Sequence, residues 1–393
     1  MLVVGLFWGA SFMRLYKDRN QTGFIETENG IIYKDKDLSQ KFGMQKIDGK
    51  LYYFDQKTGC LTSGFQKVKD KIYYFQEDGK ILSGLKTIKK DTYFFNDDAS
   101  LLTDAFHSVK KDKQNQISYF DADGKMHTKG NLTIDGIQYS FNSHGGLQYD
   151  INYLKSQVER IISEYGGNTS VYFKDLTSNE SFLINDTSYY PCCMIKMPAL
   201  VAVYQAIEQG KFTYDDYQFY IDNMIIVSDN TSYNRLMKTL GNGDGLQGLQ
   251  KVNQICQTYG MQYTQLHHGL LPGEDHFTDN QSNVSRTKDI GILLEALYNK
   301  QVLSKQSSED MLTLLKKCND TDGIAQGFPS SIEYAHKTGE ISNIFNDGGI
   351  VYLPNRNYIV VVFAEDVGYK YNLMKDVSTF LFDYQSTFAK QNK

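Results

Sequence analysis

The 393-residue sequence has one tryptophan, five prolines and five cysteines, and these scarcities exclude several classes of protein. The cysteines are odd in number and irregularly spaced, and no two form a C-x-x-C pair, so we expect neither a disulfide framework nor a zinc site. A formal net charge of −5 gives no electrostatic pattern for binding nucleic acid or anionic lipid. Nothing in the composition requires a metal or another cofactor, and we expect none.

One apolar run, at residues 2–13, indicates a membrane-related role. It is uncharged, basic residues follow it, and it is too short to span a bilayer comfortably but long enough for the hydrophobic region of a signal peptide. We therefore predict that residues 1–20 are an export signal or a short anchor. The alternative is a terminal strand or helix packed on the protein.

Tyrosine and phenylalanine, by contrast, number 29 and 23, and many of them recur in a repeated phrase. GMQKIDGKLYYFDQKTGCLTS, GFQKVKDKIYYFQEDGKILS and GLKTIKKDTYFFNDDASLLT begin at Gly43, Gly64 and Gly84, and looser copies lie on both sides. The period of about twenty residues is typical of repeat arrays. Each unit alternates apolar and polar residues around an aromatic cluster and then reaches a turn, which predicts one β-hairpin per repeat. We predict that residues 21–150 form an all-β hairpin-repeat solenoid.

These repeats resemble the choline- or glucan-binding cell-wall repeats of Gram-positive surface proteins and clostridial toxins. The typical unit begins with Gly-Trp, whereas Gly-Met, Gly-Phe and Gly-Leu stand here and the repeats contain no tryptophan. Tryptophan forms the best wall of an aromatic cage for a quaternary ammonium, so the resemblance favours stacking on sugar faces over choline binding. It implies a secreted or cell-surface protein of a Gram-positive bacterium, attached to wall polysaccharide or glucan. A spacer that binds nothing is the alternative.

Residues 151–393 follow a different pattern. NYLKSQVERIISEYGG has helical periodicity, SVYFKDL and ESFLIND predict a hairpin, and a long helical region follows. EYAHKTG, GGIVYLP and YIVVVFAED predict three further strands, before a helix over about residues 371–390. Strands at both ends of the region predict one antiparallel sheet flanked by helices, in an α/β (α+β) domain.

Three short motifs occur in order in this region. They are C-x-x-K at Cys193 and Lys196, S-D-N at Ser228, Asp229 and Asn230, and K-T-G at Lys337, Thr338 and Gly339. Each motif alone is weak, but their order and their flanks, MIKMPAL, SDNTSYNRLMKTLG and NDGGIVY, make the set specific. The first spacing places its thiol and its ammonium group on one face of a helix.

The set resembles the S-x-x-K, S-D-N and K-T-G motifs of the penicillin-recognising hydrolases, especially class A β-lactamases, with cysteine in the position of the nucleophilic serine. The resemblance covers about residues 151–393. It implies a β-lactamase/transpeptidase-like hydrolase that acts on β-lactams or on D-Ala-D-Ala-type peptidoglycan amides. Two alternatives stay open: a protein that binds wall peptides or β-lactams without turnover, and a serine enzyme inactivated by mutation.

The resemblance also implies a role for each matching residue in catalysis. Cys193 would attack the carbonyl carbon, and Lys196 would deprotonate the thiol or stabilise its charge. Ser228 would carry a proton to the leaving nitrogen. Lys337 would complete the catalytic set and help to bind a substrate carboxylate.

Four further residues would contact the substrate: Asn230, Thr338, Gly339 and Glu340. Asn230 would hold its amide, and Thr338 would bind its carboxylate together with the lysine of the same motif. The backbone N–H groups of Cys193 and of Glu340, which follows Gly339, would form an oxyanion hole.

Two features depart from the class A pattern. A thiol beside a cation and a helix end titrates below its usual range, so Cys193 and Lys196 would rest as thiolate and ammonium, although the larger sulfur would misalign a site shaped for oxygen. A vicinal disulfide between Cys192 and Cys193 would block the site.

The loop LHHGLLPGEDHFTDNQSN lacks the E-x-x-L-N motif that positions the hydrolytic water, so an acyl-enzyme would persist. Glu274 is the candidate deacylating base, with a solvated loop acid as the alternative.

Other chemically active side chains are predicted to be structural. His336, beside the K-T-G motif, is expected to pack at the start of its strand. Cys256 and Cys318 are expected to be core thiols in helices. His267 and His268 are expected in a surface loop.

Overall fold

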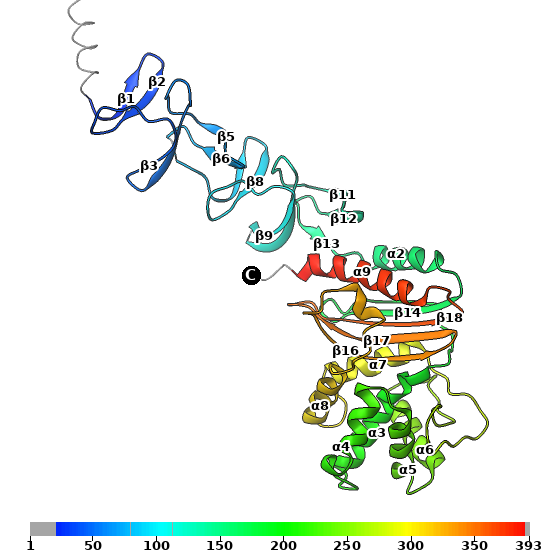
Figure 1. The fold of residues 1–393 in the computed structure, drawn as a ribbon. Helices are drawn as coiled ribbons and strands as arrows, with labels where there is room; N and C mark the ends of the chain where they lie inside the picture. The colour runs from blue at the N-terminus through cyan, green and yellow to red at the C-terminus, as the bar shows by residue number, and fades with distance from the viewer. Residues whose placement is uncertain (1–20, 79, 112, 390–393) are drawn as a thin grey trace, which may run out of the picture. The chain divides into compact units, whose positions relative to one another are not determined.

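The computed structural model describes residues 21–389 except residues 79 and 112, and the predicted export segment at residues 1–20 lies outside this part. The chain divides into two units, Met1–Gln148 and Tyr149–Lys393 (Figure 1). The boundary predicted from the sequence, between residues 150 and 151, falls two residues later. None of the described helices has the length and apolar composition needed to cross a membrane.

Antiparallel hairpins make up the described part of the first unit. The pairs are β1 (Gly23–Thr27) with β2 (Gly30–Lys34), β3 (Gly43–Ile47) with β4 (Lys50–Phe54), β5 (Gly64–Val68) with β6 (Lys71–Phe75), β7 (Gly84–Ile88) with β8 (Asp91–Phe95), and β9 (Ala105–Lys111) with β10 (Gln114–Phe120). A three-stranded sheet follows, made of β11 (Gly130–Ile134), β12 (Ile137–Phe141) and β13 (Leu147–Gln148). The hairpins agree with the prediction of one hairpin per repeat.

The recurring glycine and the recurring phenylalanine explain why each repeat folds in this way. Gly64 pairs with Phe75 across its hairpin and has a φ of +87°, a left-handed conformation that favours glycine. The Phe75 side chain is fully buried, and the Tyr53 ring of the preceding hairpin lies 5.8 Å from it. Aromatic residues therefore supply both the core of each hairpin and its contact with the next one.

The second unit is built on a five-stranded antiparallel sheet with the order β15-β14-β18-β17-β16. Its strands are β14 (Asn168–Asp175), β15 (Ser181–Ile184), β16 (Glu333–Ile341), β17 (Ile344–Tyr352) and β18 (Tyr358–Glu365). Pairing of β14 with β18 joins the early hairpin to the late strands. The predicted antiparallel sheet with strands from both ends of this region is confirmed, and β16, with its K-T-G motif, is an edge strand.

Helices lie on both faces of this sheet (Figure 1). The helices are α2 (Ile151–Ser163), α3 (Lys196–Glu208), α4 (Tyr214–Ile226), α5 (Asn230–Leu240), α6 (Gly245–Thr258), α7 (Thr287–Tyr298), α8 (Lys305–Leu315) and α9 (Lys370–Ala389). Helices α2 and α9 cover one face, and α7, α8 and the helical region around α3 lie on the other. Several helices begin where the sequence offers a capping side chain, such as Asp150 before α2 and Asp229 before α5.

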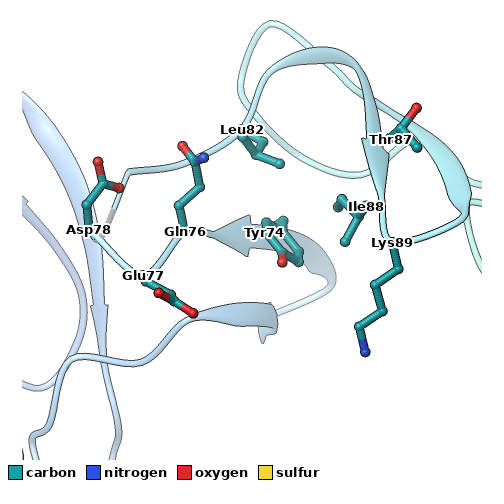
Figure 2. A pocket seen from close by; sticks show the side chains of 8 residues that line it. All are labelled: Tyr74, Gln76, Glu77, Asp78, Leu82, Thr87, Ile88 and Lys89. Atoms are coloured by element: carbon teal, nitrogen blue, oxygen red, sulfur yellow. The ribbon is translucent and has the colours of Figure 1, made fainter.

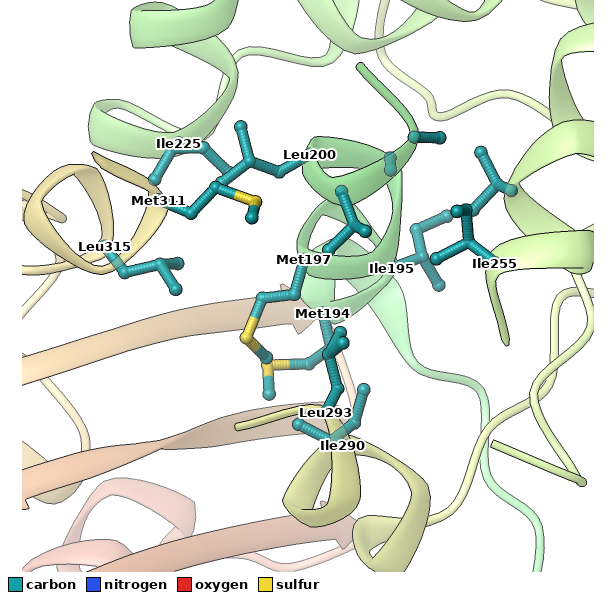
Figure 3. Close-up of a cluster of buried hydrophobic side chains, with 14 of the residues drawn as sticks. Met194, Ile195, Met197, Leu200, Ile225, Ile255, Ile290, Leu293, Met311 and Leu315 are labelled. Atoms are coloured by element: carbon teal, nitrogen blue, oxygen red, sulfur yellow. The ribbon is translucent and has the colours of Figure 1, made fainter. Parts of the chain in front are cut away.

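Helix α3 is apolar on all sides and lies in the centre of the helical region. Residues 196–204 of this helix are all buried. Figure 3 shows its side chains among those of α4, α6, α7 and α8, including Ile225, Ile255, Leu293 and Met311. A helix surrounded in this way cannot rotate or shift without opening the core. The residues at its N-terminus are therefore held firmly in place.

Candidate active site

Cys193 lies in a single 3-10 turn, η1 (Cys192–Ile195), which leads directly into α3. The preceding residue, Cys192, has a φ of +50°, a left-handed conformation that is uncommon for a residue with a side chain. Met194 and Ile195 anchor the turn in the hydrophobic core. The Sγ atom of Cys193 lies 3.2 Å from the Nζ atom of Lys196, so the two groups predicted to share a face are in contact.

Lys196 is fully buried and brings the first two motifs together. Its ammonium group donates to the Ser228 carbonyl oxygen at 2.6 Å, to the Ser228 hydroxyl at 3.2 Å and to Asn230 Oδ1 at 2.7 Å. Ser228 has a φ of +58°, and this turn points both of its oxygens at the lysine. Asp229 caps α5 by accepting a hydrogen bond from the Ser232 N–H at 2.6 Å, which fixes the S-D-N motif at the helix start.

Burial and charge set the protonation states of this cluster in opposite ways. Burial by itself would raise the pKa of Cys193, but the Lys196 and Lys337 ammonium groups hold it below its ordinary value. Burial lowers the pKa of Lys196 to about 8, and the Cys193 thiolate opposes that shift. Burial raises the pKa of the neighbouring Cys192 to about 12. Cys193 is therefore the thiol of this pair that ionises more readily.

The two adjacent thiols are not joined in the structure. In this state the Cys193 sulfur is a thiol, and the vicinal disulfide considered from the sequence stays a prediction.

The K-T-G motif lies on β16, and its side chains are already engaged. Lys337 is fully buried, and its Nζ atom donates to the Thr338 carbonyl oxygen at 2.9 Å. The Thr338 hydroxyl donates to Asp320 Oδ2 at 2.6 Å. Asp320 has no counterpart in the sequence motifs, and it places a carboxylate against a hydroxyl that was predicted to bind a substrate carboxylate.

The main chain of β16 lies directly against the turn that carries the thiol. A Cβ atom added to Gly339 would lie 2.6 Å from the Cys193 backbone nitrogen, so only glycine fits there. The side chain of Glu340 points to solvent and forms an ion pair with Lys370 at 2.8 Å. Because β16 is an edge strand, alternate N–H groups along it have no partner strand.

A second connection between the sheet and the turn comes from β17. Asn346, which pairs with Gly339 across the strands, donates from Nδ2 to the Tyr190 carbonyl oxygen at 3.0 Å. Asn346 begins the NDGGIVY flank, but the sequence analysis assigned it no role.

Glu274 lies in the loop between α6 and α7, and its backbone rather than its side chain contacts the S-D-N helix. Its N–H donates to the Thr231 hydroxyl at 3.2 Å, and its carbonyl oxygen accepts from Asn234 Nδ2 at 2.9 Å. The carboxylate is exposed, and no hydrogen bond or ion pair joins it to any residue that the structure describes. In the same loop, His267 pairs with Asp279 at 2.9 Å.

A cavity of about 550 Å³ lies in the first unit, between consecutive hairpins. Figure 2 shows the Tyr74 ring in this cavity, close to Leu82 and Ile88. Gln76, Glu77, Asp78, Thr87 and Lys89 line the rest. An aromatic face bordered by carboxylates, an amide and an ammonium group suits a polyhydroxylated ligand better than a purely apolar one.

Solved structures with the same fold support the architecture of the second unit. The structure of PBP-A superposes with a TM-score of 0.53 and 22% identity, and the match covers 60% of this chain and 97% of that one. A β-lactamase from Sphaerobacter thermophilus gives a TM-score of 0.53 and 20% identity over 60% and 98% of the two chains. A PBP-A mutant solved as an acyl-enzyme complex with penicillin G gives 0.52 and 22% over 60% and 96%. The second unit therefore has a β-lactamase-like α/β fold.

The family assignment rests on a sequence comparison. The model of the β-lactamase enzyme family matches residues 153–221 and 217–385, which together exceed half of the chain. The chain belongs to the β-lactamase enzyme family. No curated protein is similar enough to this sequence to count as a relative.

Proposed function

We propose that this chain is a cell-surface acyl-transfer enzyme that uses Cys193 as its nucleophile on β-lactams or D-Ala-D-Ala-type peptidoglycan amides. The contact of 3.2 Å between the Cys193 sulfur and the buried Lys196 ammonium group carries this proposal. A buried cation in contact with a thiol favours the thiolate, which is the nucleophilic form. Membership of the β-lactamase enzyme family supports the same reaction class.

Acylation follows from the positions of three side chains. The Cys193 thiolate attacks the carbonyl carbon, an S–C bond forms, and the carbonyl π electrons move onto oxygen. The tetrahedral intermediate then collapses, the C–N bond breaks, and a thioester links the acyl group to the protein. The leaving nitrogen takes a proton from the Lys196 ammonium group through the Ser228 hydroxyl, which lies 3.2 Å from Nζ.

Backbone donors would stabilise the charge on the carbonyl oxygen. The N–H groups of Cys193 and Glu340 are assigned this role, and the close approach of β16 at Gly339 supports it. Loss of one such donor typically costs about 3 kcal/mol of barrier stabilisation. The Asn230 side chain would hold the substrate amide beside the thiol.

Deacylation is expected to be slow. Hydrolysis of the thioester needs a base that activates water, and the exposed Glu274 carboxylate has no contact with the Cys193 cluster among the described residues. We therefore propose a protein that forms a lasting acyl adduct rather than an efficient lactamase.

Asp320 would affect a different step, the binding of substrate, because its carboxylate would repel a substrate carboxylate at Thr338.

The repeats would attach this domain to cell-wall polysaccharide or glucan. The cavity around Tyr74, with its aromatic face and polar rim, supports sugar stacking. The full chain should sediment with purified Gram-positive cell walls. Tyr74→Ala should weaken this binding, while Tyr73→Ala, a change at the neighbouring ring outside the cavity, should not.

Intact mass combined with peptide mapping tests the acylation proposal. The reduced full chain is mixed with a penicillin and a cephalosporin, and Cys193→Ala and Cys192→Ala are treated in parallel. We expect an acyl adduct on Cys193 that Cys193→Ala loses and Cys192→Ala keeps. Loss of the antibiotic without a lasting adduct would show fast deacylation by a base not identified here. Neither adduct nor loss would refute an acylating enzyme and favour a protein that binds without turnover.

A further inference from the structure

A second cluster of thiol, imidazole and carboxylate lies apart from the Cys193 contacts. Cys318 lies just beyond the end of α8, not within a helix as expected from the sequence, and it lines the same pocket as His336 on β16. The Nδ1 atom of His336 lies 3.1 Å from Asp347 Oδ1 on β17. The order thiol, imidazole, carboxylate is the arrangement that activates a nucleophile.

The carboxylate at the end of this chain of contacts is fully buried and firmly held. Asp347 accepts the Ile324 N–H at 2.8 Å and the Tyr334 hydroxyl at 3.2 Å in addition to its contact with His336. The Tyr334 ring also stacks on the imidazole, with 4.1 Å between ring centres. His336 therefore packs in its strand as predicted, but it also contacts the Asp347 carboxylate.

Both reactive groups open onto a cavity. Cys318 and His336 line a pocket of about 460 Å³ together with Phe328, Ser330 and Gln326, among others. Cys318 retains 7% of its accessible surface, and that surface faces this space. A volume of this size admits a small molecule and excludes the surface of another protein.

The groups around the sulfur favour its ionised form. Burial would raise the pKa of Cys318, but the hydrogen bond from His336 and the nearby Lys337 ammonium group hold it below its ordinary value. Burial would lower the pKa of His336, whereas the Asp347 carboxylate and the Cys318 thiol raise it to about 9. Lys316 and Glu333 also line the pocket, and because they form an ion pair with each other, their charges balance.

We propose that Cys318 is a reactive thiol that exchanges with small disulfides entering this pocket, activated by His336 and Asp347. The sulfur attacks one sulfur of the disulfide R–S–S–R. A bond forms between Cys318 and that sulfur, the original S–S bond breaks, and the other half leaves as a thiolate. The incoming disulfide supplies the oxidising equivalents, so no further oxidant is needed. His336 acts as a positioning residue that keeps the proton away from the sulfur.

No metal explains this cluster. Among the described residues, no group of three or more His, Cys, Asp or Glu side chains is placed to hold a metal ion. The alternative is that Cys318 is a buried thiol without special reactivity. In that case it should form a mixed disulfide no faster than another buried cysteine.

The test measures the rate at which each cysteine forms a mixed disulfide with the aromatic disulfide dithiodipyridine. The full chain carries Cys193→Ala, so that the proposed nucleophile cannot consume the reagent, and peptide mapping assigns the label. Cys256 is the internal control, because it is fully buried and its burial raises its pKa to about 12. At pH 7 we expect Cys318 to react at least about tenfold faster than Cys256, since one pKa unit changes the thiolate population about tenfold.

Variants separate chemical activation from simple accessibility. His336→Gln, which keeps a hydrogen-bonding side chain, should slow Cys318 labelling at pH 7 at least about tenfold. Between pH 8 and pH 6 an ordinary thiol loses about 75-fold of its thiolate, so the variant should show that steep decline and the parent a much shallower one. If His336→Gln does not fold, Asp347→Asn should give the same steep decline.

Two results would overturn the proposal. One is equal labelling of Cys318 and Cys256 in the folded parent. The other is rapid labelling of Cys318 whose rate and pH profile do not change in a folded His336→Gln or Asp347→Asn variant.

Discussion

Replacing Lys196 by methionine removes the buried cation that contacts the Cys193 sulfur while keeping a side chain of similar length. The charges lie 3.2 Å apart, and an effective dielectric of about 20 gives an attraction of about 5 kcal/mol. That is the upper bound, because opposite charges at such distances shift a pKa in proteins by about 1–3 units. We expect the pKa of Cys193 to rise in Lys196→Met, because the cation that lowers it is removed.

The direction of the rate change follows from the thiolate population. A higher pKa leaves less thiolate at pH 7, and the greater nucleophilicity of the more basic thiolate offsets about half of this loss on a logarithmic scale. With the general range of 1–3 units, Cys193 should therefore react up to about 3–30-fold more slowly at pH 7. The rate should recover as the pH rises toward 10, because deprotonation by solvent then replaces the missing cation.

The assay is alkylation by iodoacetamide, a neutral reagent that needs no antibiotic-binding site. Rates at Cys193 are measured by peptide mapping from pH 5 to pH 10 in the natural chain and in Lys196→Met. Cys192 is the internal control, since it should react slowly in both proteins. Thermal unfolding is measured alongside, because the Ser228 carbonyl and Asn230 lose a buried donor, which costs about 1–3 kcal/mol each. An unchanged pH profile in a folded variant would refute the ion-pair argument.

Three further changes test other parts of the structure. Asp320→Asn removes the charge beside the Thr338 hydroxyl and should strengthen binding of a penicillin carboxylate about fivefold, the size of one charge repulsion at about 4 Å in water; the dependence of acylation rate on antibiotic concentration measures it, and weaker binding would contradict the argument. Because the fold raises the pKa of His336 to about 9, its protonation stabilises the protein fully below about pH 6.5 and this contribution disappears as the pH rises through 9. The excess unfolding free energy of the natural chain over His336→Gln in urea should therefore fall from pH 6 to pH 10, and a constant difference would exclude this titration. Gly339→Ala should slow acylation of Cys193, the proposed nucleophile, at least about tenfold and destabilise the chain by about 1–3 kcal/mol, because its Cβ atom would meet the backbone at 2.6 Å. Gly368→Ala, whose Cβ atom would meet nothing within 4 Å, is the matched control and should change neither quantity.

The sequence predicts the fold well where a local pattern has one structural solution. The repeating Gly and the aromatic cluster of each repeat predict its hairpin, because only glycine suits the left-handed start and the rings must be buried. The strand patterns near Val171 and Val360 predict one sheet, because both runs are too apolar to face water. The arrangement of the hairpins as a solenoid stays a prediction, as does their binding of wall polymer.

The candidate site is predictable only in part. The motifs identify Cys193, Lys196 and Ser228. Helix periodicity explains the spacing of Cys193 and Lys196, and the resemblance to the family points to Ser228. No local pattern identifies the roles of Asp320 and Asn346, since Asp320 contacts Thr338 and Asn346 contacts Tyr190 only in the folded chain. The prediction that Cys318 lies in a helix was wrong, because α8 ends at Leu315, whereas the prediction that it is a buried thiol is confirmed.

By itself, the sequence determined the order of the elements and the division into repeats and a mixed domain. It also identified Cys193 as the thiol beside Lys196, the lysine of the C-x-x-K motif. Only the tertiary structure decided which groups carry charge. A pKa depends on how much water is removed from a group and on which partners replace it, and packing sets both over long stretches of chain. The lowered pKa of Cys193 beside a buried Lys196 and the engagement of Thr338 by Asp320 are therefore properties of the fold.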